Sequence, residues 1–428
     1  MSAVNDREIL DAAKAHYGVA AKIAYPEQFA LSDRWSHWSR MASEAMGGFA
    51  SAAEAIGFAQ QKMGFEHRHN VADSIHRWGL YQQALEDDFP DRKLELARIC
   101  ESRLSAPATV RWYRGRPMSN MFFWHAYEYL STSRAVPRPR RIVEIGGGYG
   151  ALARLWLGQS DTLESYWLTD FPEALFFVEV YLRSHFPGLS LHYWQSGDKL
   201  ADVEKAGYDI VLFPAQCAAE LSGLSGDLLV NSGSMQEMPE SAILYWSKWI
   251  EESKLGHFWA CNYFLQPVQQ VRGGSANWMC PRVSADWECL SSRLDAPLVR
   301  TQTVRHFREV IYKRLDTRKI SRAQQQFLAD QILASFTARI DLTDTAGILQ
   351  LFEAVRLSAR PDACLRLIDV LGSFTDYRPK ELVYLCNLAL KSYQLPSDKR
   401  DHVRAILDDV MMVAREEHAS AIPTTPLF

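Results

Sequence analysis

The sequence of 428 residues has no long apolar run and no long block of basic residues. Its first residues, MSAVNDREIL, lack the apolar stretch of a secretory signal, and no segment is apolar enough to cross a bilayer. We therefore expect a cytoplasmic protein with no membrane span. The formal net charge of -4 argues against an extended nucleic-acid surface, so no nucleic-acid partner is expected.

Paired cysteines and metal-binding motifs are also lacking. The 7 cysteines are scattered, none belongs to a C-x-x-C pair, and their number is odd, which fits a reducing compartment. His67, His69 and His76 are close in sequence, but no cysteine or carboxylate completes a zinc spacing. They are read as surface or capping histidines. No metal carboxylate pair is evident either, and we expect no metal ion.

The most informative stretch is 141–150, which reads RIVEIGGGYG. Its β-forming residues, its four glycines and the helical apolar spacing that follows from Ala151 predict a strand, a glycine turn and a helix start. Glycine has no Cβ, so a ligand can lie against bare backbone and face the N–H groups of the helix start. Asp170 ends the next apolar run, where a carboxylate can accept hydrogen bonds from both hydroxyls of a ribose.

The glycine pattern has two interpretations. Gly146, Gly148 and Ala151 match G-x-G-x-x-[G/A], which is typical of dinucleotide-binding oxidoreductases. Glu144, Gly146, Gly148 and Gly150 match E-x-G-x-G-x-G, which is typical of S-adenosylmethionine sites. The acid two residues before the first glycine favours S-adenosylmethionine, and an NAD-dependent oxidoreductase stays as the alternative.

The chain alternates strands and helices in its middle third, which predicts an α/β fold with a doubly wound Rossmann-like sheet, flanked by all-helical regions. The expected domains are an N-terminal helical region, a nucleotide-binding domain, a C-terminal solenoid-like helical domain and a loose tail, over 1–105, 106–318, 319–418 and 419–428. The helical regions are expected to dock onto the catalytic domain, a second subunit or another protein.

Strands are predicted over 141–146, 165–169, 190–194, 208–213, 227–231, 257–263, 298–304 and 306–313. The last two would form an antiparallel end of the sheet. N-terminal helices are predicted over 6–17, 40–62, 71–85 and 93–103. The segment 266–297 reads as a long insert, in which Trp278 and Trp287 would either stack on a sugar or act as buried anchors. Ligands of such sheets bind beyond the carboxyl ends of the strands.

Two further groups have open interpretations. Arg114 and Arg116, in RWYRGRP, either bind an anionic substrate or are solvated loop residues. His125 lies on the helix predicted just before the first glycine-linked strand and is a candidate base.

Three segments carry a family resemblance: VEIGGGYGALARLW, LTDFPEAL and DLLVNSGSMQEMPESAILYW. In this order they resemble the bacterial sugar O-methyltransferases, which are class I enzymes dependent on S-adenosylmethionine. The match covers about 140–265. It implies a class I methyltransferase fold, S-adenosylmethionine as cofactor and a sugar or glycan hydroxyl as methyl acceptor. A peptide or small natural product as acceptor, and a scaffold with a vestigial pocket, remain alternatives.

The resemblance also implies residue roles, from the methionine end of the cofactor to the acceptor. The implied cofactor-binding residues are Glu144, Gly146, Gly147, Gly148, Tyr149 and Gly150 at the methionine, Asp170, Phe171 and Pro172 at the ribose, Ala215 and Gln216 at the adenine, and Asn231 and Ser232 at the sulfonium. The expected substrate-binding residues are Arg114, Arg116, Gln236, Asn262 and Trp278.

A sugar hydroxyl is a very weak acid, so methyl transfer benefits from a base. Glu237 is the first candidate, because partial burial beside Met235 and Met238 would raise its pKa. Its alternative role is to cap or orient a strand end, in which case His125 or a metal-activated hydroxyl would serve as the base.

Overall fold

The fold is described from a computed structural model. The described residues are 6–26, 33–62, 71–104, 111–113, 115–263, 287–294, 307–314, 361–372, 382, 385–387, 389–390 and 394–421. Among them, no helix is long and apolar enough to cross a membrane.

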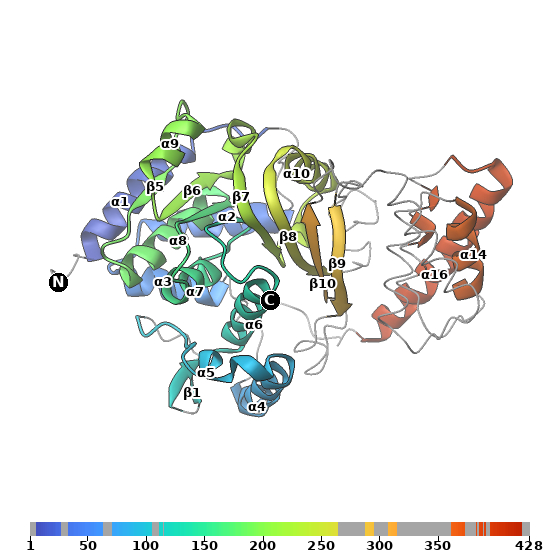
Figure 1. Cartoon of the computed structure of the whole chain (residues 1–428), viewed down its shortest axis with the longest axis horizontal. Helices are drawn as coiled ribbons and strands as arrows, with labels where there is room; N and C mark the ends of the chain where they lie inside the picture. Colours follow the sequence, from blue (N-terminus) through green and yellow to red (C-terminus); the bar gives the residue numbers. More distant parts are fainter. Residues whose placement is uncertain are drawn as a thin grey trace.

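The central feature of the described chain is an eight-stranded sheet, ordered β5-β6-β4-β3-β7-β8-β10-β9 (Figure 1). The strands are β3 (Arg141–Ile145), β4 (Ser165–Asp170), β5 (Leu191–Tyr193), β6 (Ile210–Pro214), β7 (Ser225–Ser232), β8 (Lys254–Tyr263), β9 (Trp287–Leu294) and β10 (Phe307–Arg314). The strands from β5 to β8 pair in parallel, whereas β10 is antiparallel to both β8 and β9.

This strand order identifies the fold class. The chain starts at the centre with β3, steps outward through β4 to β6, then crosses back to β7 and β8, as in a doubly wound sheet. The antiparallel β10 inserts between β8 and β9, which is the arrangement of a class I methyltransferase sheet. The predicted fold class is therefore confirmed.

The outermost strand lies elsewhere than predicted. The range 298–304 lies outside the described residues, and β9 falls within the segment read as an insert. Trp287 at its start is 1% exposed, and the guanidinium carbon of Arg314 lies 4.2 Å from the centre of its ring. Of the two interpretations of Trp287, the structure supports the buried anchor.

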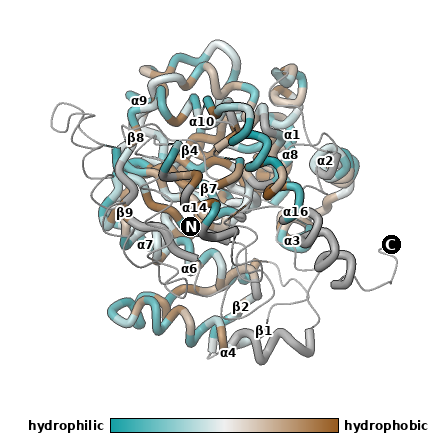
Figure 2. Tube along the Cα trace, turned by 90° about the vertical axis from the view of Figure 1, so that its right-hand side faces the viewer, coloured by the Kyte–Doolittle hydropathy of each residue, from teal (hydrophilic) through white to brown (hydrophobic). Residues whose placement is uncertain are grey.

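Alternating side chains of the sheet enter two hydrophobic cores. On one face, Ile142 and Tyr166 pack beneath α6 (Asn120–Ala135), α7 (Ala151–Gln159) and α8 (Pro172–His185). On the other face, Val143 and Trp167 pack beneath α9 (Leu200–Ala206) and α10 (Glu240–Glu252). Because both faces are covered, the side chains of β4 are buried up to Thr169 and the centre of β7 is a run of apolar residues, seen as brown in Figure 2.

The N-terminal helices pack against the sheet's own helix layer. They are α1 (Asp6–Ala20), α2 (Asp33–Met46) and α3 (Ala52–Lys62), and all three contact α8. Ile9 and Ala55 share one hydrophobic cluster with Phe177 of α8, and the His16 ring lies 2.9 Å from the buried Glu179 carboxylate. A single helix over 40–62 was expected, but a turn at Gly47 separates α2 from α3.

The remaining described elements lie beside this core. They are α4 (Val71–Asp88), η3 (Pro90–Arg92), α5 (Lys93–Leu96), the hairpin of β1 (Arg111–Tyr113) and β2 (Arg116–Met118), η4 (Ala215–Leu221), η5 (Met235–Glu237), α14 (Pro361–Gly372) and α16 (Ser397–Ala421). A helix was expected over 93–103, but α5 ends at Leu96 after one turn. The chain then leaves the helix, and the Glu101 carboxylate accepts hydrogen bonds from Gln60 and Ser119.

Candidate cofactor site

The glycine loop that follows β3 is held closely against its neighbours. An ideal Cβ on Gly146 would lie 2.2 Å from Ser234 Oγ, and one on Gly147 would lie 2.4 Å from Leu168 Cδ1. Gly146 also has a φ of 78°, which disfavours side chains with a Cβ. Packing alone therefore requires glycine at the first two positions.

The next glycine lies on the open side of the loop. Gly148 has a φ of 58°, and a Cβ placed on it would meet nothing within 4 Å. Its N–H donates to Asp170 Oδ2 at 3.0 Å, while the N–H of Phe171 donates to Asp170 Oδ1 at 2.8 Å. The carboxylate thus ties the loop to the end of β4, and bare backbone borders an open space beside it.

Asp170 keeps acceptor capacity after these two bonds. A carboxylate offers about four lone-pair positions, of which the two backbone donors occupy two. Burial raises the pKa of Asp170 to about 7, and the same two N–H groups act to lower it. The position suits two hydroxyl donors on a ligand, as predicted for a ribose.

Glu144 lies beneath the loop, with 4% of its surface exposed. The Tyr166 hydroxyl donates to Glu144 Oε2 at 2.8 Å. Burial raises the pKa of Glu144 to about 8, the Tyr166 hydroxyl opposes this shift, and the charges of Glu128 and Asp170 add to it. The loop therefore rests on a buried carboxyl group close to two further acids.

Asn231 and Asn262 link the ends of β7 and β8 to the loop. Asn231 Nδ2 donates to the Ile145 carbonyl at 2.8 Å and to Ser234 Oγ at 2.6 Å. Its Oδ1 accepts from Asn262 Nδ2 at 2.8 Å. With both donors and its oxygen engaged, Asn231 is fully buried and positions the loop. Sequence reasoning missed Ser234, whose role depends on this three-dimensional contact.

Several buried polar atoms at the carboxyl edge have no hydrogen-bond partner among the described residues. They are Thr169 Oγ1, Gln216 Oε1 and Nε2, Ser232 Oγ and Asn262 Oδ1. They lie at the ends of β4, β7 and β8 and just after β6. A buried polar group without a partner costs about 1–3 kcal/mol, so this edge is suited to a polar ligand.

Two aromatic residues of the N-terminal region reach the same edge. The Trp35 ring on α2 lies 5.3 Å from the Phe171 ring, centre to centre. Tyr25 lies near Asp170 and Glu173, because burial and then the charges of these two acids raise the pKa of its phenol. No local pattern indicated either residue, since only the packing of α1 and α2 on α8 brings them here.

The candidate bases lie on different elements. His125, on α6, donates from Nδ1 to Glu128 Oε2 at 2.7 Å, and its ring meets that of Tyr149 edge-on at 5.7 Å. Glu237 ends η5, is half-buried, and its N–H donates to the Ser234 carbonyl at 3.0 Å. Gln236 also belongs to η5, and its side chain lies outside the described part.

Arg116 has a different environment from the one expected. Its guanidinium donates to the carbonyls of Leu96 and Ile99 and to Gln82 Oε1. A guanidinium so engaged holds the chain between α5 and β2, so we do not assign it to the substrate. Arg114 and Trp278 lie outside the described residues.

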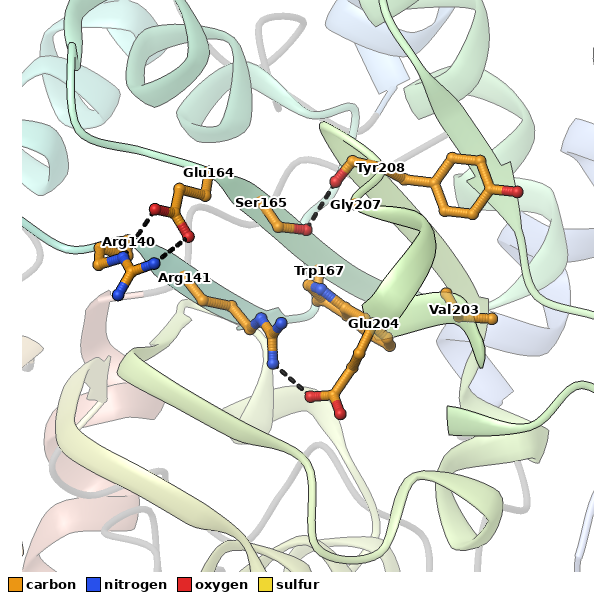
Figure 3. A pocket seen from close by; sticks show the side chains of 9 residues that line it. All are labelled: Arg140, Arg141, Glu164, Ser165, Trp167, Val203, Glu204, Gly207 and Tyr208. Carbon is orange, nitrogen blue, oxygen red and sulfur yellow. Dashed lines mark hydrogen bonds and ion pairs between the residues drawn. The ribbon is translucent and has the colours of Figure 1, made fainter. Parts of the chain in front are cut away.

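Other site types find less support. Within the described ranges, no group of three or more His, Cys, Asp or Glu residues is arranged to hold a metal. A small hollow lies at the amino ends of β3 and β4, on the edge opposite the glycine loop (Figure 3). Ion pairs of Arg140 with Glu164 and of Arg141 with Glu204 line it, so its charges are already matched.

The sequence matches no family model, and no curated protein is similar enough to be matched. Solved structures with a similar fold include the N-terminal domain of EvdMO1 with S-adenosylhomocysteine bound, at 15% identity over 54% of this chain and 97% of that one, with a TM-score of 0.29. Another is the N-methyltransferase NodS from Bradyrhizobium japonicum, at 12% identity over 45% and 85% of the two chains, with a TM-score of 0.28. The assignment of the fold rests on the strand order.

Proposed function

We propose that the protein is an S-adenosylmethionine-dependent O-methyltransferase whose acceptor is a hydroxyl of a sugar or glycan. One observation carries the proposal: the open backbone at Gly148 lies directly beside Asp170, at the carboxyl edge of a class I methyltransferase sheet. The sugar acceptor is supported by the three sequence segments that resemble the sugar O-methyltransferases.

The residues at this edge fit the cofactor's parts. The glycine loop and Glu144 would hold the methionine end, and the spare lone pairs of Asp170 would accept the ribose hydroxyls. Gln216 is 7% exposed. No hydrogen bond of ordinary geometry engages its amide among the described residues, although the Tyr25 phenol lies close enough to interact with it. One such amide can accept from and donate to the edge of an adenine, which suits its place after β6.

When bound, the cofactor would supply a methyl group on a positively charged sulfur. The chain would hold the acceptor oxygen in line with that methyl, and such positioning can contribute roughly 7–11 kcal/mol at best. It would also supply a base for the hydroxyl proton, which adds roughly 10²–10⁴-fold. The carboxylate of Asp170 beside the loop, once ionised, favours a cationic ligand over the pyrophosphate of NAD.

Calorimetric titration with S-adenosylhomocysteine and with NAD tests the cofactor. We expect heat of binding only with S-adenosylhomocysteine, and with affinity falling as the pH drops below about 7, because protonated Asp170 accepts fewer hydrogen bonds. In Asp170→Asn the affinity should fall and its pH dependence should weaken. Absence of binding, or tighter binding of NAD, would overturn the proposal.

Transfer of a labelled methyl group to candidate acceptors tests the substrate. The panel should contain free sugars, nucleotide-activated sugars, glycans and peptides. Each acceptor is also tested with the Gly148→Val variant, whose side chain would occupy the open side of the loop. We expect label in the carbohydrate acceptors only. Labelling of peptides instead would reject the sugar assignment and keep the cofactor assignment.

A further inference from the structure

Glu128 lies three residues after His125 on α6 and is directly bonded to it. The Nδ1 to Oε2 distance is 2.7 Å, and the two side chains are 17% and 3% exposed. A carboxylate that accepts from Nδ1 fixes the imidazole in the tautomer whose Nε2 carries a lone pair. Among the described residues, Nε2 of His125 makes no hydrogen bond, so that nitrogen is available to a ligand.

The pair lies at the edge of the glycine loop. Because α6 directly precedes β3 and packs on α7, its first turns lie near the end of β3. The edge-on contact of His125 with Tyr149, a loop residue, places the ring there. The Glu128 carboxylate is also near enough to Glu144, beneath the loop, for its charge to help raise the pKa of that acid.

The helix that carries the pair is fixed at its start and near its middle. Ser119 caps its start, accepting from the N–H of Phe122 at 3.1 Å and donating to Glu101 Oε2 at 2.8 Å. Farther along, Glu309 of β10 accepts from the Tyr127 hydroxyl at 2.8 Å and from Trp259 Nε1 at 3.1 Å. A histidine on such a clamped helix has little freedom to reorient, which suits a defined proton transfer.

We propose that Glu128 is a positioning residue that holds His125 with its Nε2 directed to take the proton of the methyl acceptor. The proposal rests on the proposed function. As the acceptor oxygen forms its bond to the methyl carbon, the carbon–sulfur bond breaks and sulfur keeps that electron pair. The hydroxyl proton passes to Nε2 and is later released to water. The carboxylate of Glu128 stabilises the imidazolium that forms.

The test is nitrogen NMR of the full chain labelled with ¹⁵N-histidine, with and without S-adenosylhomocysteine. The signals of His125 are assigned by their loss in His125→Gln. We expect a protonated Nδ1 and an unprotonated Nε2, and a change in the His125 signals when the ligand binds. His257, which contacts the Asp227 carbonyl at the other end of the sheet, should be unaffected and serves as the internal control.

Glu128→Gln should convert the single His125 tautomer into a mixture, and Glu128→Asp should restore much of the original signal. A wild-type tautomer protonated at Nε2, an unchanged tautomer in Glu128→Gln, or unchanged His125 signals at saturating ligand would each overturn this proposal. Calorimetry on the same samples separates the two proposals, because failure to bind S-adenosylhomocysteine counts against the proposed function itself.

Kinetics with the acceptor found in the methyl-transfer panel provide a second readout. His125→Ala should lower kcat by roughly 10²–10⁴-fold, as expected for loss of a base. Glu128→Gln should lower kcat by a smaller factor, leave KM for the cofactor unchanged and recover in Glu128→Asp. A rise in KM with kcat unchanged would show a role in binding and contradict the positioning role.

Discussion

At the scale of single residues, the glycines of the loop are required for two different reasons. Gly146 must avoid Ser234, whereas Gly148 faces open space and needs glycine only for its backbone conformation. Gly146 is therefore needed for the structure of the loop, whereas Gly148 is the position that would border the ligand.

Gly146→Ala and Gly148→Ala should differ accordingly. Both place a Cβ at positive φ, at a cost of about 1–3 kcal/mol, and only Gly146→Ala adds a clash with Ser234 worth about 1–3 kcal/mol more. We expect the larger loss of unfolding free energy for Gly146→Ala, and the larger loss of cofactor affinity relative to stability for Gly148→Ala. Urea denaturation and calorimetry measure the two effects, and equal destabilisation would contradict the packing argument.

Glu144 should make the ligand-free protein less stable as the pH rises. Its folded pKa of about 8 lies above its ordinary value of 4.5, so the folded state binds more protons between these values. The contribution of the neutral Glu144 carboxyl to the free energy of unfolding is fully present below about pH 4.5. It is lost as the pH rises through about 8.

Melting temperatures at pH 5.5, 7 and 8.5 test this effect. Glu144→Gln should flatten the decline, though Asp170, whose pKa is also raised, should keep part of it. Glu164→Gln is the matched control, because the Glu164 side chain is 59% exposed and should change the profile little. Parallel profiles for wild type and Glu144→Gln would show that the buried carboxyl does not titrate in this range.

At the scale of elements, the N-terminal helices extend the wall of the candidate site. α2 brings Trp35 against Phe171, and the Ser43 hydroxyl donates to Glu173 Oε1 at 3.4 Å. The contacts reach Phe171, which precedes α8, and Glu173 in the first turn of α8, close to Asp170.

Trp35→Ala should therefore weaken S-adenosylhomocysteine binding roughly two- to tenfold, given about 0.5–1.5 kcal/mol for an aromatic pair. Trp112→Ala, on the β1 hairpin and 68% exposed, should leave the affinity unchanged. Calorimetry measures both variants. Equal affinities in the two variants would mean that α2 supports α8 without shaping the ligand site.

Local patterns predicted the elements that build the sheet and missed what their packing brings together. The strand at 141–145, its glycine turn and Asp170 follow from apolar runs and residue chemistry. β9 was missed, because WECLSSRL alternates poorly and follows a long polar stretch. The three-residue spacing of His125 and Glu128 is visible in the sequence, but the burial of Glu128 is not.

At the scale of the whole molecule, the N-terminal helices share a hydrophobic cluster with the helix layer of the sheet. By contrast, we propose that 319–418 forms a separate helical domain, as its sequence pattern predicts. The sheet would then depend on the N-terminal helices for its packing but not on the C-terminal helical domain.

Two truncations test this difference. A chain ending at residue 318 should keep its affinity for S-adenosylhomocysteine and its cooperative unfolding. A chain starting at residue 63 should be insoluble or bind a hydrophobic dye, because loss of α1–α3 uncovers Phe177 and its neighbours on α8. Loss of binding in the first truncation would contradict the proposed domain boundary.

The clamp between α6 and β10 has a consequence for synthesis on the ribosome. Glu309 and Tyr127 are 182 residues apart in the chain. At typical translation speeds, the helix leaves the ribosome on the order of 10–40 seconds before the strand that holds it. During that interval the Tyr127 phenol has no acid to bind, and the nascent chain stays in an unfinished, chaperone-accessible form until its last sheet strands arrive.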